Sequence, residues 1–171
     1  MEDWQSIVKE NEMKRIAKFM FDGDKDVELT DKYHYHITAH FSKAKQQDAE
    51  YCFKHFRNVL DNKVVGRRNR LYKACFIEEG KNHLSKSYND RHCHLLIQKP
   101  KHLTKKKYEE QFNELWQNIC GNDNIKWTRI EKQKNGIDGV VDYLTKELEF
   151  GHKAFIEDLS DNASKQKNRK Q

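Results

Sequence analysis

Two stretches of the chain alternate between apolar and polar side chains at the period of a β-strand. Residues 33–41, YHYHITAHF, place Tyr35 and Ile37 on one face and histidines with a threonine on the other, which predicts a half-buried strand. Residues 91–100, RHCHLLIQKP, begin similarly but continue into a run that is apolar on both faces. That pattern is typical of a central strand. Residues 71–80 and 125–133 predict two further strands.

Apolar positions at helical spacing predict helices before, between and after these strands. Residues 3–21 fit one bent helix or two short ones, and residues 42–61 fit a helix with Ser42 as its N-cap. Thr104 caps a helix that Gly121 ends, and a last helix is expected over residues 137–150. This order predicts an α+β fold: an antiparallel sheet of ferredoxin-like or RRM-like topology with helices packed on it.

Length and composition favour one domain with an extension at each end. The chain has 171 residues, 36% hydrophobic and 35% charged, as expected of a highly solvated globular domain. We expect a helical extension over residues 1–30, a main domain over 31–158 and a basic disordered tail over 159–171. No apolar run has the length of a membrane span, and acidic residues stand where a signal peptide carries basic ones. A cytoplasmic protein without a membrane partner is therefore expected.

The charge balance permits a polyanionic partner. Lysines and arginines number 33 against 27 aspartates and glutamates, and the sequence pI is about 9.0. The residues that we expect to follow a phosphate backbone are Arg67, Arg68, Arg70, Lys105, Lys106 and Lys107. The four cysteines have no close pair and stand beside apolar residues, which predicts buried free thiols.

The histidine pair in RHCHLLIQKP is the first candidate for chemistry. Because side chains alternate along a strand, His92 and His94 point the same way, and two imidazoles so placed can share one divalent ion. A second H-x-H pattern occurs in the earlier strand, at His34 and His36. We favour His92 and His94 because they lead into the strand that is apolar on both faces.

A tyrosine on the last predicted helix is the second candidate. At about 100° per residue, Tyr143 lies about 110° from the centre of the apolar stripe, with Lys146 and Glu147 beside it. A tyrosine at the edge of a stripe is most often an amphipathic packing residue. Its interpretation therefore depends on the other motifs of the chain.

Taken in order, FIEEG, HCHLLI and YLTK resemble the motifs of the HUH endonucleases, a family that includes rolling-circle replication initiators, relaxases and transposases. The resemblance covers about residues 33–150. It implies that His92 and His94 bind Mg²⁺ or Mn²⁺ together with one acidic ligand, which is Glu78 or Glu79. Alternation allows only one of these two to face the histidines, and we favour Glu78.

The resemblance also implies a nucleophile. Tyr143 would attack a phosphodiester of single-stranded DNA, leaving a 5′-phosphotyrosine link and a free 3′-hydroxyl, while Lys146 helps to neutralise the phosphate. His36 and Thr38, on the polar face of the first strand, are expected to line the DNA path, without His36 being a metal ligand. The chain has one motif tyrosine and no G-x-x-x-x-G-K-[ST] sequence, so no attached helicase is expected.

The expected function is a site-specific endonuclease that nicks and joins single-stranded DNA. It would initiate replication of a plasmid, virus or other mobile element at an origin or hairpin, with a host helicase and polymerase as possible further partners. A transposase or relaxase with the same chemistry is one alternative. A non-catalytic RRM-like nucleic-acid-binding protein is another, because exposed aromatic side chains on such a sheet stack bases without any chemistry.

Overall fold

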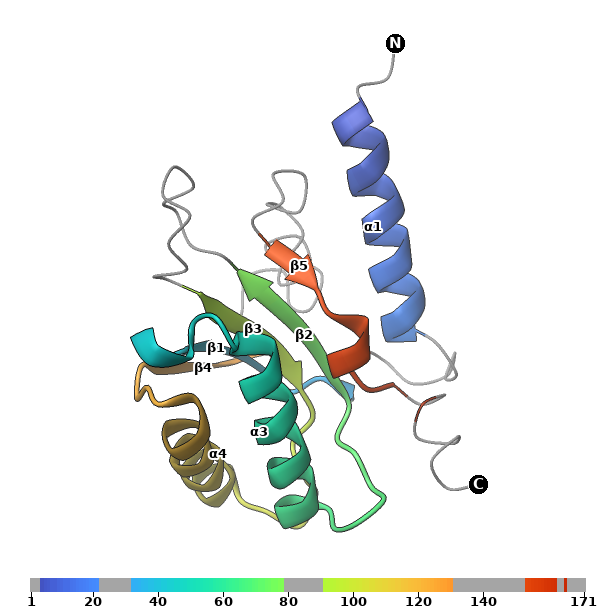
Figure 1. The fold of residues 1–171 in the computed structure, drawn as a ribbon. Helices are drawn as coiled ribbons and strands as arrows, with labels where there is room; N and C mark the ends of the chain where they lie inside the picture. The colour runs from blue at the N-terminus through green and yellow to red at the C-terminus, as the bar shows by residue number, and fades with distance from the viewer. Residues whose placement is uncertain (1–3, 22–31, 79–90, 131–152, 163–164, 166–171) are drawn as a thin grey trace.

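The computed structural model describes residues 4–21, 32–78, 91–130, 153–162 and 165. Figure 1 shows how these elements are arranged, with helices α3 and α4 on one side of a β-sheet and helix α1 beside β2 and β5. The elements are α1 (Trp4–Phe21), β1 (Tyr35–His40), η1 (Lys43–Lys45), α3 (Ala49–Val64), β2 (Lys73–Glu78), β3 (His92–Ile97), α4 (Lys105–Cys120), β4 (Ile125–Arg129), β5 (Lys153–Phe155) and η4 (Glu157–Leu159).

The sheet has the strand order β4-β1-β3-β2-β5, and every neighbouring pair is antiparallel. All four strands predicted from the hydrophobic pattern are present, and the short β5 joins them beside β2. β3 lies between β1 and β2, as expected of a strand with apolar side chains on both faces. The protein therefore has an α+β fold with an antiparallel sheet.

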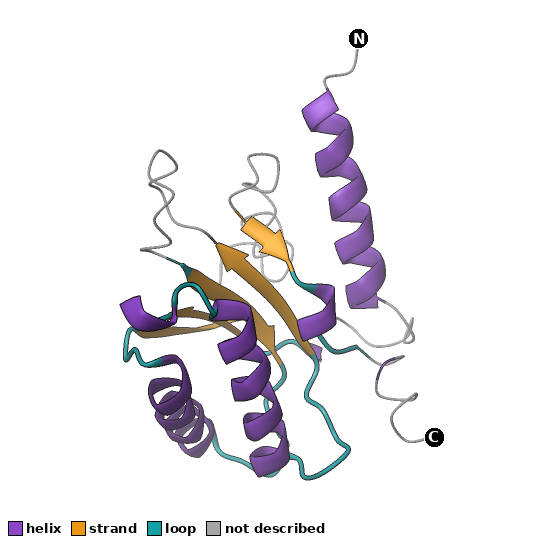
Figure 2. Ribbon diagram, viewed as in Figure 1, coloured by secondary structure: helices purple, strands orange, loops and turns teal. Residues whose placement is uncertain are grey.

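The larger core fills the space between the sheet and the helices α3 and α4, which cover one of its faces (Figure 2). Strand positions two apart, such as Cys93, Leu95 and Ile97, point into this core and pack against the apolar stripes of the two helices. Trp116 on α4 is fully buried and donates its indole N–H to the carbonyl oxygen of His40 at 2.8 Å. The helical layer is thus fixed to β1 by a hydrogen bond as well as by packing.

The ends of the two helices show which capping predictions hold. Thr104 caps α4 by accepting from the backbone N–H of Lys107 at 3.3 Å, and Gly121 ends it with a φ of 75°, as predicted. Ser42, in contrast, precedes the short 3-10 helix η1, and its side chain makes no capping hydrogen bond. α3 begins at Ala49, because the chain first turns through η1 before reaching the helical layer.

A smaller core lies on the other face of the sheet. Ile16, Phe19 and Met20 in the last turns of α1 pack against residues of β2, β3 and β5, among them Phe76 and Leu96. The N-terminal segment, for which the pattern allowed two short helices, contains one helix over Trp4–Phe21. None of the helices in the described residues is both long and apolar enough to cross a membrane.

A buried ionic network joins α3, β2 and the chain after β5. Lys73 Nζ lies 2.8 Å from Asp61 Oδ2 and 3.1 Å from Asp161 Oδ2, and all three side chains are at most 1% exposed. Arg70 also contacts Asp61, at 3.2 Å, and Arg57 lies 3.8 Å from Asp161. Burial alone would make these charges very unfavourable. Because they are paired with one another, they hold the three segments together.

The predicted disordered tail is wrong at its N-terminal boundary. Leu159, Ser160, Asp161 and Asn162 are buried, and Asp161 exchanges backbone hydrogen bonds of 2.9 and 3.1 Å with Lys73. The segment has few large apolar side chains, so the hydrophobic pattern did not mark it as folded. Its stability comes from backbone pairing and from small polar groups such as the Ser160 hydroxyl, which accepts from the Cys75 N–H at 2.9 Å.

The substitution Lys73→Met tests this network. It keeps most of the side-chain length but leaves two buried carboxylates without their shared cation, so we expect the free energy of unfolding to fall by about 3–5 kcal/mol. Lys63→Met is the matched control, because Lys63 pairs with Glu114 at 3.9 Å on the surface and should change stability by less than about 1 kcal/mol. Urea denaturation measures both, and equal effects of the two substitutions would contradict a stabilising role for the network.

Candidate metal centre

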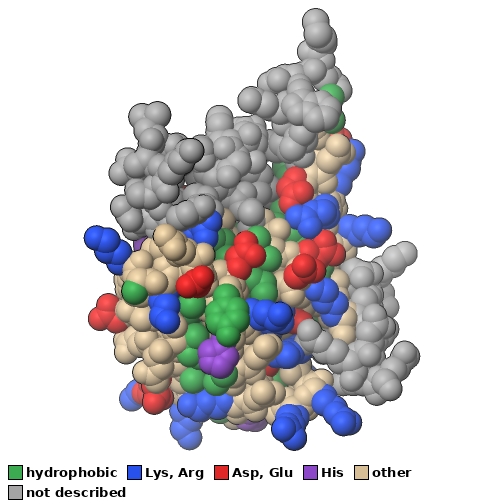
Figure 3. Space-filling model, in the orientation of Figure 1, with side chains coloured by type: hydrophobic (Ala, Val, Ile, Leu, Met, Phe, Trp, Pro, Cys, Tyr) green, Lys and Arg blue, Asp and Glu red, His purple; other side chains and the backbone are tan. Residues whose placement is uncertain are grey.

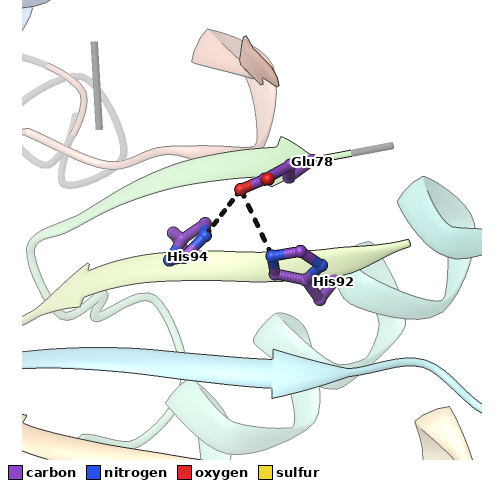
Figure 4. Close-up of side chains that lie close together, drawn as sticks. All are labelled: Glu78, His92 and His94. Carbon is purple, nitrogen blue, oxygen red and sulfur yellow. Dashed lines mark hydrogen bonds and ion pairs between the residues drawn. The ribbon is translucent and has the colours of Figure 1, made fainter. Parts of the chain in front are cut away.

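Three side chains from β2 and β3 converge on the face of the sheet opposite α3 and α4 (Figure 4). Glu78 on β2 pairs directly with His92 on β3, and Phe76 pairs with His94. Paired residues on antiparallel strands share a face, and residues two apart along one strand do so as well. The register therefore places Glu78, His92 and His94 together, as alternation favoured. Glu79, the alternative acidic residue, lies outside the described residues.

The distances within this cluster suit coordination of a single ion. Glu78 Oε2 lies 3.2 Å from His92 Nε2 and 2.9 Å from His94 Nε2. One ligand atom from each of the three residues lies within 4.8 Å of the other two. Two atoms that each bind one ion at about 2.1 Å are about 3.0–3.4 Å apart at octahedral to tetrahedral angles. Two imidazole nitrogens and a carboxylate oxygen are also a common ligand set for divalent metals. The cluster therefore has ligand atoms of suitable kind and spacing to hold a metal ion.

The cluster is sheltered at one end and more accessible at the other. The side chain of His94 is 3% exposed, that of Glu78 11% and that of His92 14%. A carboxylate with so little exposure needs compensating partners, and the two imidazole edges provide them. A ligand entering the site would therefore meet His92 before His94.

Three side chains of β1 surround the cluster. His36 Nε2 lies 3.1 Å from His94 Nδ1, and Thr38 Oγ1 lies 3.3 Å from the same atom. His40 stacks on His92, with ring centroids 4.9 Å apart and an interplanar angle of 22°. The sequence correctly predicted that His36 and Thr38 share a face, but that face is not open to water at His36, which is only 8% exposed.

The second H-x-H pattern does not form a second cluster among the described residues. His34 Nδ1 accepts from the backbone N–H of Lys99 at 3.0 Å, whereas His36 contacts His94. The two histidines of this pattern therefore have different neighbours, and the preference for His92 and His94 as the metal pair is consistent with the geometry.

The predicted basic residues lie away from the cluster. Arg67 and Arg68 precede β2, and Lys105, Lys106 and Lys107 form the first turn of α4, after β3. Both segments adjoin the end of the sheet where Lys73 pairs with Ile97, about 17 Å along the strand from the pair Glu78 and His92. Arg70 contacts the buried Asp61 at 3.2 Å. On the face drawn in Figure 3, basic and acidic side chains are interspersed.

Lys126 on β4 is a cation that the sequence did not single out for the site. It pairs with Thr38 in the β1–β4 register and is exposed, so it extends the face that carries the cluster. Its place follows from the order of the strands, which composition does not reveal.

The predicted tyrosine motif is not placed by the structure, because Tyr143 and Lys146 lie outside the described residues.

The cysteines are not candidates for metal ligation or nucleophilic chemistry in this region. All four are free and buried, as predicted. Cys93 stands between the two histidines in sequence but points to the opposite face, and burial raises the pKa of its thiol well above the usual value. A thiol held in its neutral form is a poor ligand and nucleophile.

Comparisons of the chain with protein-family models, with curated proteins and with solved structures found no match. A functional proposal for this chain must therefore start from the geometry of the cluster and from the motifs in the sequence.

The substitutions His94→Ala and Glu78→Ala test whether the cluster binds a metal. Each removes one of the three ligand atoms, so we expect the Mn²⁺ affinity to fall by more than the about 10–100-fold that loss of an outer-shell partner causes. His55→Ala, at an exposed position of α3, should leave the affinity unchanged. Isothermal titration calorimetry measures all three. Wild-type affinity in His94→Ala would exclude a site shared by these residues.

Proposed function

We propose that the protein is a metal-dependent endonuclease of the HUH type that cuts single-stranded DNA through a tyrosine. The observation that carries this proposal is the cluster of Glu78, His92 and His94 on adjacent strands, with ligand atoms within 4.8 Å of one another. It reproduces in three dimensions the strand acid and the H-x-H pair on which the sequence resemblance rests. A YLTK motif follows downstream, with Tyr143 and Lys146 three residues apart.

The architecture supports the proposal. The order β1, α3, β2, β3, α4, β4, with the spatial order β4-β1-β3-β2, is compatible with a ferredoxin-like or RRM-like topology. The two central strands, β1 and β3, carry the histidines that form and surround the cluster. α3 and α4 cover one face of the sheet, whereas on the other face the last turns of α1 pack on the apolar residues of the smaller core and the cluster lies further along the same strands.

In the proposed reaction, the Tyr143 oxygen forms a bond to the phosphorus of the scissile phosphodiester. The bond from phosphorus to the 3′ oxygen breaks, the phenol loses its proton, and the departing 3′ oxygen gains one. Lys146, three residues further along the predicted helix, offsets part of the phosphate charge. Because a phosphotyrosine ester replaces a phosphodiester, the strand can be rejoined without an external energy source.

The ligand set bears on the identity of the metal. A divalent ion bound there would draw charge from the phosphoryl oxygens and orient the scissile bond. Mg²⁺ prefers oxygen ligands, whereas imidazole nitrogens suit Mn²⁺ and later transition metals better. With two nitrogen atoms and one oxygen atom, the cluster favours Mn²⁺ over Mg²⁺ in affinity. Glu78, His92 and His94 would leave further coordination positions for the substrate.

The roles of the basic residues follow from their distance to the cluster. Lys126 shares the face of the cluster and is proposed to contact the phosphate backbone close to the scissile bond. We expect Arg67, Arg68 and the lysines of the first turn of α4 to contact the phosphate backbone only of a DNA strand that is long enough to reach the other end of the sheet. Arg70 contacts Asp61, so we assign it to the buried ionic network and not to DNA binding.

The biological role and a rival function are separate questions. We favour a replication initiator of a mobile element, with a transposase or relaxase of the same chemistry as the alternative. A non-catalytic nucleic-acid-binding protein is the rival from another class, but Tyr35, Phe76 and Phe155 on the strands are buried and so are not available to stack bases. A binding protein needs no carboxylate buried between two histidines, which is why the cluster favours the enzyme.

The substitution Tyr143→Phe tests the nucleophile. Removal of one hydroxyl group should leave Mn²⁺ binding and oligonucleotide binding unchanged but abolish covalent attachment, because the ring is kept and the attacking atom is lost. Incubation with a pool of single-stranded oligonucleotides and Mn²⁺, followed by denaturing electrophoresis and peptide mass spectrometry, measures attachment. The adduct should be found on the peptide GVVDYLTK.

Tyr51→Phe is the matched control for this experiment. Tyr51 is 76% exposed on α3, so its hydroxyl is accessible without being near the cluster. This variant should attach to DNA as the wild-type protein does. An adduct on Tyr51, or nicking by Tyr143→Phe, would contradict the assignment. Binding without any Mn²⁺-dependent adduct would favour the non-catalytic rival.

The substitution Lys126→Ala tests the substrate path. If Lys126 contacts one phosphate, its loss should lower the slope of log affinity against log salt concentration by about 0.7 for single-stranded DNA. Lys54→Ala, at an exposed position of α3, should leave the slope unchanged. Fluorescence anisotropy over a range of NaCl concentrations gives both slopes. Equal slopes for the wild-type protein and Lys126→Ala would place the DNA elsewhere.

A further inference from the structure

The β1 residues His36, Thr38 and His40 have no role in the proposed cleavage chemistry, yet two of them contact His94. Its Nε2 atom lies 2.9 Å from Glu78 Oε2 and belongs to the cluster. Its other ring nitrogen, Nδ1, lies 3.1 Å from His36 Nε2 and 3.3 Å from Thr38 Oγ1. One ring thus faces the cluster with one nitrogen and β1 with the other.

The chemistry of a metal-binding histidine indicates which of the two rings donates the hydrogen bond between them. A neutral imidazole that binds a metal through Nε2 carries its hydrogen on Nδ1, and this N–H needs an acceptor. A hydrogen bond from the second nitrogen commonly sets both the tautomer and the ring orientation of a metal-binding histidine. His36 Nε2, at 3.1 Å, is within the distance for this bond, and the Thr38 hydroxyl is a second acceptor.

We propose that His36 is a positioning residue of the metal centre. It accepts a hydrogen bond from Nδ1 of His94 and so presents Nε2 of His94 to the metal. This inference rests on the metal site of the proposed function but not on the tyrosine chemistry. It replaces the expectation that His36 lines the DNA path, because its hydrogen bond is directed at a ligand of the cluster and its side chain is 8% exposed.

The surroundings of His36 argue against a packing role alone. In the sheet register it pairs with Leu96 on β3 and with Thr128 on β4. Leu96 is fully buried and belongs to the smaller apolar core. An imidazole beside such a residue is costly unless its nitrogens are hydrogen-bonded. Packing alone would be served better by an apolar side chain at this position.

The proposal assigns a tautomer to each ring in the metal-bound protein. His94 carries its hydrogen on Nδ1, and His36 therefore accepts through an unprotonated Nε2 and carries its own hydrogen on Nδ1. On the neighbouring pair, His40 stacks on His92 at 4.9 Å and restricts the plane of that ring. β1 thus orients both histidines of the cluster, one by a hydrogen bond and the other by stacking.

Three substitutions of His36 separate hydrogen bonding from packing. His36→Phe keeps a ring but has no acceptor, and His36→Ala removes both. We expect each to weaken Mn²⁺ binding by about 10–100-fold in the full chain, as measured by calorimetry. His36→Gln keeps an acceptor in its side-chain amide oxygen and should restore most of the affinity. His34→Phe is the control, because His34 contacts the backbone of Lys99 and not the cluster; it should bind Mn²⁺ as the wild-type protein does.

A measurement on the wild-type protein keeps the proposal testable if a variant fails to fold. Nitrogen-15 NMR spectra of the histidine rings with Zn²⁺ bound should show His36 protonated on Nδ1 and His94 protonated on Nδ1. A proton on Nε2 of His36 in that spectrum, or wild-type Mn²⁺ affinity in folded His36→Phe, would overturn the proposal. If Mn²⁺ binding depends on His36 as described but no adduct forms on Tyr143, this inference stands and the nuclease does not. A wild-type chain that binds no Mn²⁺ would remove both.

Discussion

The pairing register of β3 between β1 and β2 is the constraint on which the rest of the structure depends. Because side chains alternate along a strand, a slip of one residue would turn His92 and His94 toward the helical layer and Cys93 and Leu95 toward the opposite face. The larger core excludes such a slip, since it buries Cys93 and Leu95 against α3 and α4. The geometry of the cluster is therefore stabilised by apolar packing on the other side of the same strands.

Polarity changes along the strands on the face that carries the cluster. At one end Ala74 and Leu96 pair with each other and belong to the smaller core beneath α1. At the other end Glu78 pairs with His92. The last turns of α1 pack on the apolar end, and the cluster lies further along the same strands. A single face thus supplies both a core that fixes the strands and a polar site beside it.

Patterns within single segments predicted β1, β2, β3 and β4 and the residues of the cluster. The contacts that β1 makes with the cluster depend on strand pairing, which these patterns do not give. Alternation was sufficient to place His92 with His94 and to favour Glu78, because each inference concerns positions within one strand. The contact of His36 with His94 depends on β1 lying beside β3, which is a property of strand order and not of either segment alone. The same limitation explains the basic residues: clusters near the histidine strand in sequence lie at the far end of the sheet, since an antiparallel strand carries the chain away from its starting point.

The C-terminal boundary shows a second limit of hydrophobic patterns. Residues 159–162 contain a single large apolar side chain, yet they are buried because Lys73 and Asp161 pair through both their backbones and their side chains. Such pairing cannot be read from composition, since it requires that the two segments already lie side by side.

The ionic network and the cluster, two buried polar groups among the described residues, differ in how their charges are balanced. In the ionic network, Lys73 and two arginines offset the charges of Asp61 and Asp161, so the protein itself provides the countercharges. In the cluster, one carboxylate and two imidazoles converge, and neutral imidazoles offset a carboxylate less completely than cations do. A divalent ion would balance the charge of the cluster as Lys73 balances that of the ionic network.

Metal binding would also stabilise the fold. At a free concentration of 100 times its dissociation constant, an ion that binds only the folded chain adds about 2.7 kcal/mol of stability, similar to the effect of a buried ion pair. Metal binding and folding would then be coupled through the same strands, because β2 contributes Lys73 to the network at one end and Glu78 to the cluster at the other.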